Sequence, residues 1–505
     1  MSESLWLRPG VRRDSLPGIP RRRHRSPRWA RPDPVDELTE RLSDFTAAAV
    51  HPDEIAALLE SDGLSDDQIR ERYGYRDSFA LAEELYERVE RRYPEPDGPA
   101  HDPWRTGLLG CLLRGVVFAL PGLGYVLGAP LLAGPHDGPG LPAGTVPLLA
   151  GALSGWAWNQ GLAHRAYSWL GLGDRSAARR SLLVGAPLGA LLGSLVALAV
   201  AGRGEPGTAA FAAGQSCYLG AATVLLVLGR ERALLAALLP MAAGAVLALA
   251  RPVPAWFRLV LLMGSLAAVA LLAVREVAGV VRESGDGSRR AGLVGLLPLG
   301  ARGATPEKPA GPRLAGSLPY ALFGLGSGVL VLYAALADVI SGDEHSAVAA
   351  PAAVALTLSM GPAEWLLHRF RSGSLAGLRS SSTARAFRRG TALTLVECLA
   401  AYLAALLVLT HATSTLWPDA PGPGGVRLAG LLLLGVVLWT GLLLQSFGEV
   451  TGATVVCCAA AFAQATALAT GAGGLHWIGL AVYGTAAGAQ AALVCTTLGR
   501  VTAHR

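Results

Sequence analysis

Apolar residues in this chain gather into twelve long blocks that follow a polar N-terminal segment. Each block has about 20 residues, the length of helix that crosses a hydrocarbon core of roughly 30 Å. Backbone polar groups in lipid must be satisfied within the segment itself, so the blocks are predicted to be helices. The predicted spans are 106–131, 143–166, 181–202, 208–229, 232–250, 255–278, 317–341, 348–369, 391–412, 427–446, 449–470 and 475–498.

The polar N-terminal segment divides into a tail and a module. Residues 1–32 are rich in Arg and Pro without an apolar period, which predicts a disordered cytoplasmic tail. The tail is either a solvated leader or a patch for anionic lipid headgroups. Residues 33–97 have the apolar spacing of a small soluble helical module, in which Ser65 is a good N-cap. The helices predicted there are Asp36–Ala48, Pro52–Glu60, Asp66–Tyr73 and Asp77–Arg91. The turn at 63–65 has some likeness to a helix-turn-helix, but no nucleic-acid partner is expected.

Basic residues alternate between successive loops. The loops after the second, fourth, sixth and eighth blocks hold most of the Arg residues, whereas the other loops hold Asp and Glu. Because basic loops remain in the cytoplasm, both termini are expected there, in a bacterial-type cytoplasmic membrane crossed many times.

Two pairs of matching segments indicate an internal repeat. Ala119–Gly124 in the first span resembles Ala321–Gly326 in the seventh at an offset of 202 residues. His164-Arg165 at the end of the second span matches His368-Arg369 at the end of the eighth at an offset of 204. The expected fold is therefore an all-α membrane protein of about twelve transmembrane helices, arranged as two parallel six-helix repeats. The expected transmembrane lobes are 106–278 and 317–499, joined by a cytoplasmic linker over 279–316.

Composition supports a membrane protein and disfavours soluble chemistry. The chain is 52% hydrophobic and 16% charged, whereas soluble proteins have about 25% charged residues. Its one lysine, Lys308, precedes Pro309, so a Walker A phosphate loop is absent, and HExxH and GxSxG motifs are absent too. The six cysteines show no metal-ligand spacing. We expect neither an enzyme nor a metal or other cofactor.

The loop between the second and third spans carries a family resemblance. Leu170–Arg180 reads Leu-Gly-Leu-Gly-Asp-Arg-Ser-Ala-Ala-Arg-Arg. It resembles the Leu-Gly-x-Gly-Asp-x-x-x-Ala-Arg-Arg loop of the multidrug/oligosaccharidyl-lipid/polysaccharide (MOP) flippase superfamily, which has a similar 6+6 layout. The second copy, Arg379–Arg389, keeps the basic character without Gly-Asp. The resemblance implies either cation-coupled drug export or flipping of polyprenyl-diphosphate-linked sugars.

Few ionisable residues lie within the apolar blocks, and each is costly there and thus a functional candidate. Arg114, Glu364 and Glu397 are expected at a similar depth, roughly 8–12 Å from the cytoplasmic boundary. Gln160 precedes His164 as Glu364 precedes His368, so Gln160 and Glu364 are expected to face a central cavity. Arg114 is then expected to pair with Glu364 or Glu397.

Structural roles for the same residues stay open. Arg114 is close enough to the boundary to extend its charge into the headgroups. Glu397 could pair with Arg388 or Arg389 at the membrane face. The predicted anchors at the cytoplasmic face are His164, Arg165, His368 and Arg369.

The first functional hypothesis is a flippase for an anionic, lipid-linked saccharide, because basic cavity residues suit a diphosphate headgroup. The alternatives are a cation-coupled multidrug exporter that uses Glu364 and Glu397, and a non-transporting membrane scaffold of a polysaccharide assembly complex. The partners expected are membrane lipids, a lipid-linked oligosaccharide or small-molecule substrate, and a glycosyltransferase or polysaccharide synthase.

Overall fold

The computed structural model describes two compact units of the chain, which are divided between His101 and Asp102. The described residues are all helical or loop, without a strand. They are 33–90, 107–132, 144–201, 206–283, 311–340, 351–381, 383–416, 424–471 and 473–498. The predicted tail, 1–32, lies outside them.

The first unit is a bundle of five short helices. They are α1 (Pro34–Arg41), α2 (Ser43–Ala48), α3 (Pro52–Ser61), α4 (Asp66–Tyr73) and α5 (Ser78–Arg88). Side chains such as Ile55, Leu59 and Leu81 are fully buried between the helices. The single helix predicted over Asp36–Ala48 is wrong, because the chain turns at Leu42 (φ −99°, ψ 8°). The Ser43 hydroxyl donates to the carbonyl of Glu40 there, and such local bonds compete with the helical ladder.

Side-chain caps fix where helices of this unit begin. Ser65 and Gln68 form a reciprocal capping box at the start of α4. Gly74 ends α4 in the left-handed conformation, with φ of 79°. Asp77 accepts from the backbone N–H of Ala80 and so caps α5.

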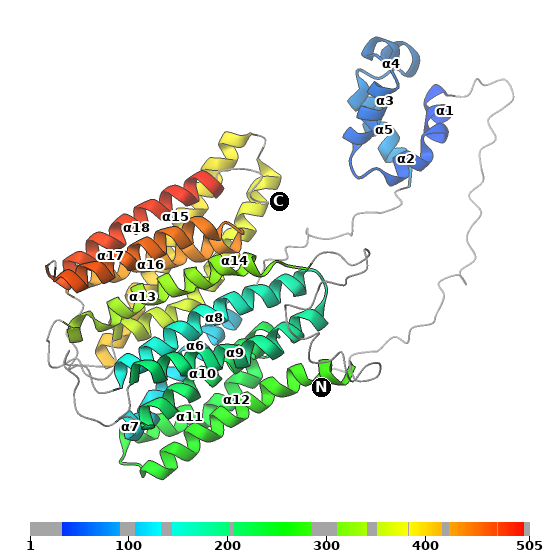
Figure 1. Cartoon of the computed structure of the whole chain (residues 1–505). Coiled ribbons are helices and arrows are strands. Elements are labelled where there is room, and N and C mark those ends of the chain that lie inside the picture. The colour runs from blue at the N-terminus through cyan, green and yellow to red at the C-terminus, as the bar shows by residue number, and fades with distance from the viewer. Residues whose placement is uncertain are drawn as a thin grey trace, which may run out of the picture. The chain divides into compact units, whose positions relative to one another are not determined.

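The second unit is a bundle of long helices (Figure 1). Its first half holds α6 (Leu108–Ala119), η1 (Leu120–Leu123), α7 (Gly124–Leu132), α8 (Thr145–Gly171), α9 (Arg175–Ala201), α10 (Pro206–Val227), α11 (Glu231–Ala250) and α12 (Ala255–Glu283). Its second half holds η4 (Leu314–Ser317), α13 (Leu318–Ile340), α14 (Pro351–Ser380), α15 (Ala384–Leu416), α16 (Gly425–Ser446), α17 (Val450–Thr470) and α18 (Leu475–Leu498). Within the described residues, ten helices are long and apolar enough to cross a membrane. The chain is therefore a multi-pass membrane protein of helical type. The two long helices outside this set are α8 and α14.

A short 3₁₀ segment interrupts the first predicted span. The segment predicted as one span over 106–131 consists of α6, η1 and α7, with η1 at Leu-Pro-Gly-Leu. Pro121 lacks the backbone N–H that a continuing helix would use. Beyond the break α7 packs against α10, α11 and α12 of its own half.

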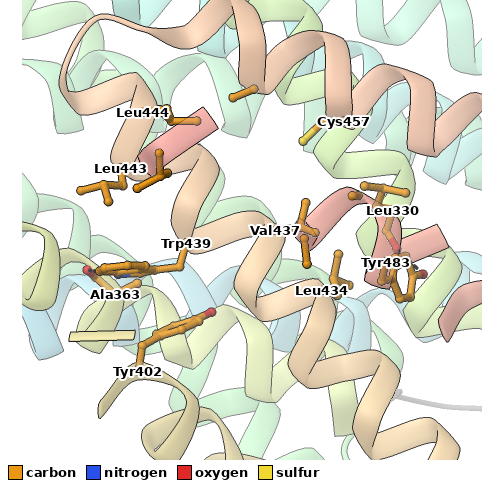
Figure 2. Packing of buried hydrophobic residues seen from close by; sticks show 14 of the residues in the cluster. Leu330, Ala363, Tyr402, Leu434, Val437, Trp439, Leu443, Leu444, Cys457 and Tyr483 are labelled. Carbon is orange, nitrogen blue, oxygen red and sulfur yellow. Dashed lines mark hydrogen bonds between the residues drawn. The ribbon is translucent and has the colours of Figure 1, made fainter. Parts of the chain in front are cut away.

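Each half has its own apolar core. The core of the first half includes Leu127, Leu182 and Leu225. The core of the second half is built around Trp439, whose indole N–H donates to the carbonyl of Ala363 over 3.4 Å. Figure 2 shows the Trp439 ring stacked on Tyr402, with 6.2 Å between ring centroids.

Two pairs of helices form the main contact between the halves. One pair is α6 with α14, and the other is α8 with α13. In the first pair the backbones nearly touch, because a methyl group added at Gly361 would lie 2.8 Å from the Cys111 carbonyl oxygen. In the second pair Gly324 lies against Gln160, and Gly328 lies against Leu153. Small residues therefore let the halves approach closely.

The direction of the helices follows from these contacts. Ser317, just before α13, lies beside His164 of α8, and Gly328 within α13 lies beside Leu153 of α8. The order along the two helices is opposite, so α8 and α13 are antiparallel.

Candidate functional site at the contact between the two halves

Arg114 on α6 forms an ion pair with a carboxylate from each half. Its Nη2 donates to Oε1 of Glu231 on α11 over 2.6 Å, and its Nη1 donates to Oε1 of Glu364 on α14. We call these three residues the Arg114 cluster. Their side chains are 36%, 28% and 23% exposed for Arg114, Glu231 and Glu364. Each of the three side chains therefore keeps part of its surface free of contact with the rest of the protein.

The two carboxylates outnumber the guanidinium, so the Arg114 cluster has a net charge of −1 when all three residues are ionised. Nε2 of His368 lies 3.9 Å from Oε1 of Glu364, one helical turn along α14. Protonation of His368 would neutralise the group. Arg114 is thus already matched by acidic side chains, and an incoming anion would have to compete with them.

Local structure explains why these side chains meet. The approach of Gly115 to Gly361 brings α6 and α14 together about one residue from Arg114 and one turn from Glu364. Glu231 is the first residue of α11, where the positive end of the helix dipole favours a carboxylate. Beside it, Arg230 forms an ion pair of 3.0 Å with Glu276, which ties the start of α11 to α12.

A second polar cluster lies where α8 meets α13. Nδ1 of His164 is 3.1 Å from the hydroxyl of Ser317, and its ring stacks on Tyr320 with 3.7 Å between centroids. Arg165 donates to the carbonyl of Pro312 over 3.2 Å. Gln160 lies against Gly324 of the other half. His164 and Arg165 therefore hold the segment that enters α13.

The structure brings together part of the predicted set. Arg114 and Glu364 pair as expected, whereas Glu397 on α15 is exposed and forms no ion pair with Arg388, Arg389 or Arg114 in the described part of the chain. The expectation that Glu397 lies at the same depth as Arg114 stays a prediction. Arg369 lies over the ring of Trp365, 5.6 Å from its centroid, which suits an interfacial anchor.

Glu231 was missed by sequence reasoning. It stands between Arg230 and Arg232 at the edge of an apolar block, where an acid has the pattern of an ordinary loop residue. The available signal was a carboxylate at the first position of a membrane helix. This signal did not identify the partner, because Arg114 is 117 residues away in the chain.

The Leu170–Arg180 loop has a structural explanation. Gly173 ends α8 with φ of 78°, and the backbone N–H of Asp174 donates to the carbonyl of Trp169. Asp174 accepts from the backbone N–H of Ala177 over 2.8 Å and thereby caps α9. That bond, with help from the Ser176 hydroxyl, lowers the pKa of Asp174. The Gly-Asp pair therefore forms a tight turn between two helices.

The row of glycines on α9 serves packing. Added methyl groups at Gly185 and Gly189 would overlap Leu162 and Trp158 of α8. Trp158 also donates its indole N–H to the carbonyl of Gly185 over 2.7 Å. In the described residues no three His, Cys, Asp or Glu side chains gather as a metal ion would require.

Comparison with known proteins adds no relative. No family model, no curated protein and no solved structure matches the chain. The functional argument therefore depends on the geometry of this molecule alone.

Proposed function

We propose that this chain is a flippase-type transporter that moves an anionic, lipid-linked saccharide across the membrane by alternating access between its two halves. The observation that carries the proposal is the Arg114 cluster. A single guanidinium links the halves through Glu364, at the place where their backbones approach most closely. An ionic link of this kind can hold one conformation and be released in the other.

A duplicated architecture supports the proposal. The contact of α6 with α14 and that of α8 with α13 are equivalent pairs under the offset of about 203 residues inferred from the sequence repeat. Under the offset of 202 between the first and seventh spans Arg114 corresponds to Gly316, and under the offset of 204 between the second and eighth spans Glu364 corresponds to Gln160. Inside the halves, the pairs α8 with α9, α11 with α12 and α10 with α12 have counterparts in α14 with α15, α17 with α18 and α16 with α18.

Twelve spans follow if α8 and α14 also cross the membrane. Both are longer than 20 residues, and both pack between helices of their own half and of the other half. This packing shields their polar residues from lipid, which removes the need for a uniformly apolar composition. Because α13, the first long helix of the second half, is antiparallel to α8, which holds the second predicted span, the two halves would start on one side of the membrane, as parallel repeats do.

The Arg-rich loops favour an orientation in which the Arg114 cluster lies toward the cytoplasm. In the proposed cycle, the ion pairs hold the halves together at that face. A phosphate group that arrives from the cytoplasm competes with Glu364 for Arg114, since guanidinium groups bind phosphate and carboxylate in the same way. The substrate would thus break the link that keeps its own entrance closed.

A cation-coupled exporter is the second candidate, and one observation favours it. The Arg114 cluster contains two acids for one base. Protonation of Glu364 would release Arg114 without any anionic substrate. The two candidates therefore differ in what opens the link, either a phosphate or a proton.

A strain that lacks the protein distinguishes these candidates. The flippase proposal expects lipid-linked sugar intermediates to accumulate, with rescue by the wild type and by Glu276→Gln. Arg114→Ala and Glu364→Gln should rescue poorly at equal expression. Normal intermediates together with raised drug sensitivity would favour the exporter. Full rescue by both Arg114→Ala and Glu364→Gln would reject a transport role for the cluster.

A further inference from the structure

A small, partly open cavity lies in the second half, far along α13 from Ser317. Its volume is about 110 Å³, and it is surrounded by the ends of α13, α14, α15, α16, α17 and α18. The polar residues that line it include Tyr333, Thr410, Ser414, Arg427, Gln464 and His476. One water molecule needs about 10–15 Å³, so the cavity can hold a small organic molecule.

The entrance to this cavity is basic. Arg427 and His476 also line a more open hollow of about 420 Å³ that borders the cavity. The same hollow contains Gly424 and Gly474, which directly precede α16 and α18. Two long helices thus present their N-terminal N–H groups at the entrance, and these carry partial positive charge. No side chain caps the start of α16 within the described residues.

Deep inside, Gln464 points to a polar occupant. Its side chain is buried, with 2% exposure, and its amide oxygen has no hydrogen-bond partner among the described residues. A buried amide group without a partner is costly, so it implies a ligand or ordered water. An amide can donate or accept, whichever its occupant requires.

The basic side chains that line the cavity indicate which class of ligand it binds. The described lining contains Arg427 and His476 but neither Asp nor Glu. Among these described residues a cation finds no carboxylate ligand, whereas an oxyanion finds a guanidinium, an amide and helix N-termini. We propose that the second half binds a small oxyanion, of carboxylate or phosphate type, between Arg427 at the entrance and Gln464 inside. This site is separate from the Arg114 cluster and does not depend on the transported substrate.

Binding can be measured on the purified full chain in detergent. Thermal unfolding is followed by tryptophan fluorescence in sodium acetate, sodium phosphate or sodium chloride at equal ionic strength. A ligand of the native state raises the unfolding temperature in a saturable way. Saturable stabilisation by acetate would indicate a carboxylate site, and stabilisation by phosphate would indicate a phosphate site. If neither anion stabilises more than chloride, the proposal is wrong.

Variants separate this site from general salt effects, which act on every protein surface. Arg427→Gln should weaken binding at least tenfold, because it removes a charged hydrogen-bond donor. Arg251→Gln, an exposed arginine after α11 with the same change of charge, should leave the affinity unchanged. Gln464→Glu keeps the size of the side chain and should also weaken binding at least tenfold at pH 7.5. It is the informative variant if Arg427→Gln does not fold. Equal affinities in Gln464→Glu and wild type would overturn the proposal.

Discussion

Removing the charge of Glu364 should shift the balance between conformations of the two halves. Glu364→Gln keeps the shape of the side chain and an oxygen that can accept from Arg114, but it removes the Coulomb attraction across the contact. Arg114 retains Glu231, which belongs to its own half. The substitution therefore weakens the link between the halves and spares the link within the first half.

The size of the shift follows from the geometry. A hydrogen bond between charged partners contributes about 1.5–3 kcal/mol. Because all three side chains of the Arg114 cluster are partly exposed, screening favours the lower end of this range, about 1.5 kcal/mol. A loss of about 1.5 kcal/mol corresponds to roughly a tenfold change in an equilibrium constant. If the halves are separated at this contact in 5% of wild-type molecules, they would be separated in about a third of Glu364→Gln molecules.

Spin labels on the two halves can detect this change. Suitable positions are Leu172 after α8 and Arg389 near the start of α15, both of which are exposed. The labels are introduced as cysteines after replacement of the native cysteines, and pulsed electron resonance measures the distances between them. Glu364→Gln should raise the ratio of molecules at longer distances to molecules at shorter distances about tenfold. Glu276→Gln is the matched control, since it breaks the ion pair of Arg230 within one half.

Two results would refute this reasoning. The distance distribution of Glu364→Gln could equal that of the wild type, which would mean that the ion pair does not hold the halves together. Alternatively, Glu276→Gln could shift the distribution equally, which would mean that any lost charge loosens the bundle.

Three further predictions concern packing, a helix cap and pH. Gly361→Ala should destabilise the chain by about 1–3 kcal/mol in thermal unfolding, because its methyl group meets the backbone of Cys111, while Gly110→Ala enters open space and should be neutral. Asp174→Ala should cost about 1 kcal/mol through loss of the cap on α9, and Asp174→Asn should restore most of it, as measured by urea titration. The pKa of Asp77 is lowered mainly by its bond to a backbone N–H. Its contribution to the first unit is therefore complete above about pH 5 and lost as the pH falls below about 4, and hydrogen exchange of peptides from 33–90 should quicken there.

The apolar pattern predicted where most of the long helices lie, but it did not predict every helix end. The helix expected over 475–498 has those bounds, and α16 and α17 begin within two residues of their predicted starts. By contrast, α14 continues to Ser380, well beyond its predicted end at 369. A helix can continue into water where its residues become polar. The end of an apolar block therefore indicates where the hydrocarbon ends, but it does not indicate where the helix ends.

The Arg114 cluster shows the other limit of sequence reasoning. Arg114 and Glu364 could be selected because a charge within an apolar block is rare and costly. Depth along a helix was sufficient to suggest that they meet. It could not show which face of α15 Glu397 occupies, and it could not reveal Glu231 at the start of another helix. Those assignments depend on how helices are rotated and packed, which only tertiary contacts determine.

The polar character of α8 and α14 has a consequence for how the protein is assembled. Both helices are less apolar than the long helices that could cross a membrane by composition alone. Neither would therefore partition well into lipid by itself during synthesis. Each packs extensively along the helix that follows it, α9 or α15, and both of these are strongly apolar. We expect each polar helix to leave the translocon together with its successor as a hairpin. Mutations that weaken α9 or α15 should therefore impair insertion of the preceding helix as well as their own.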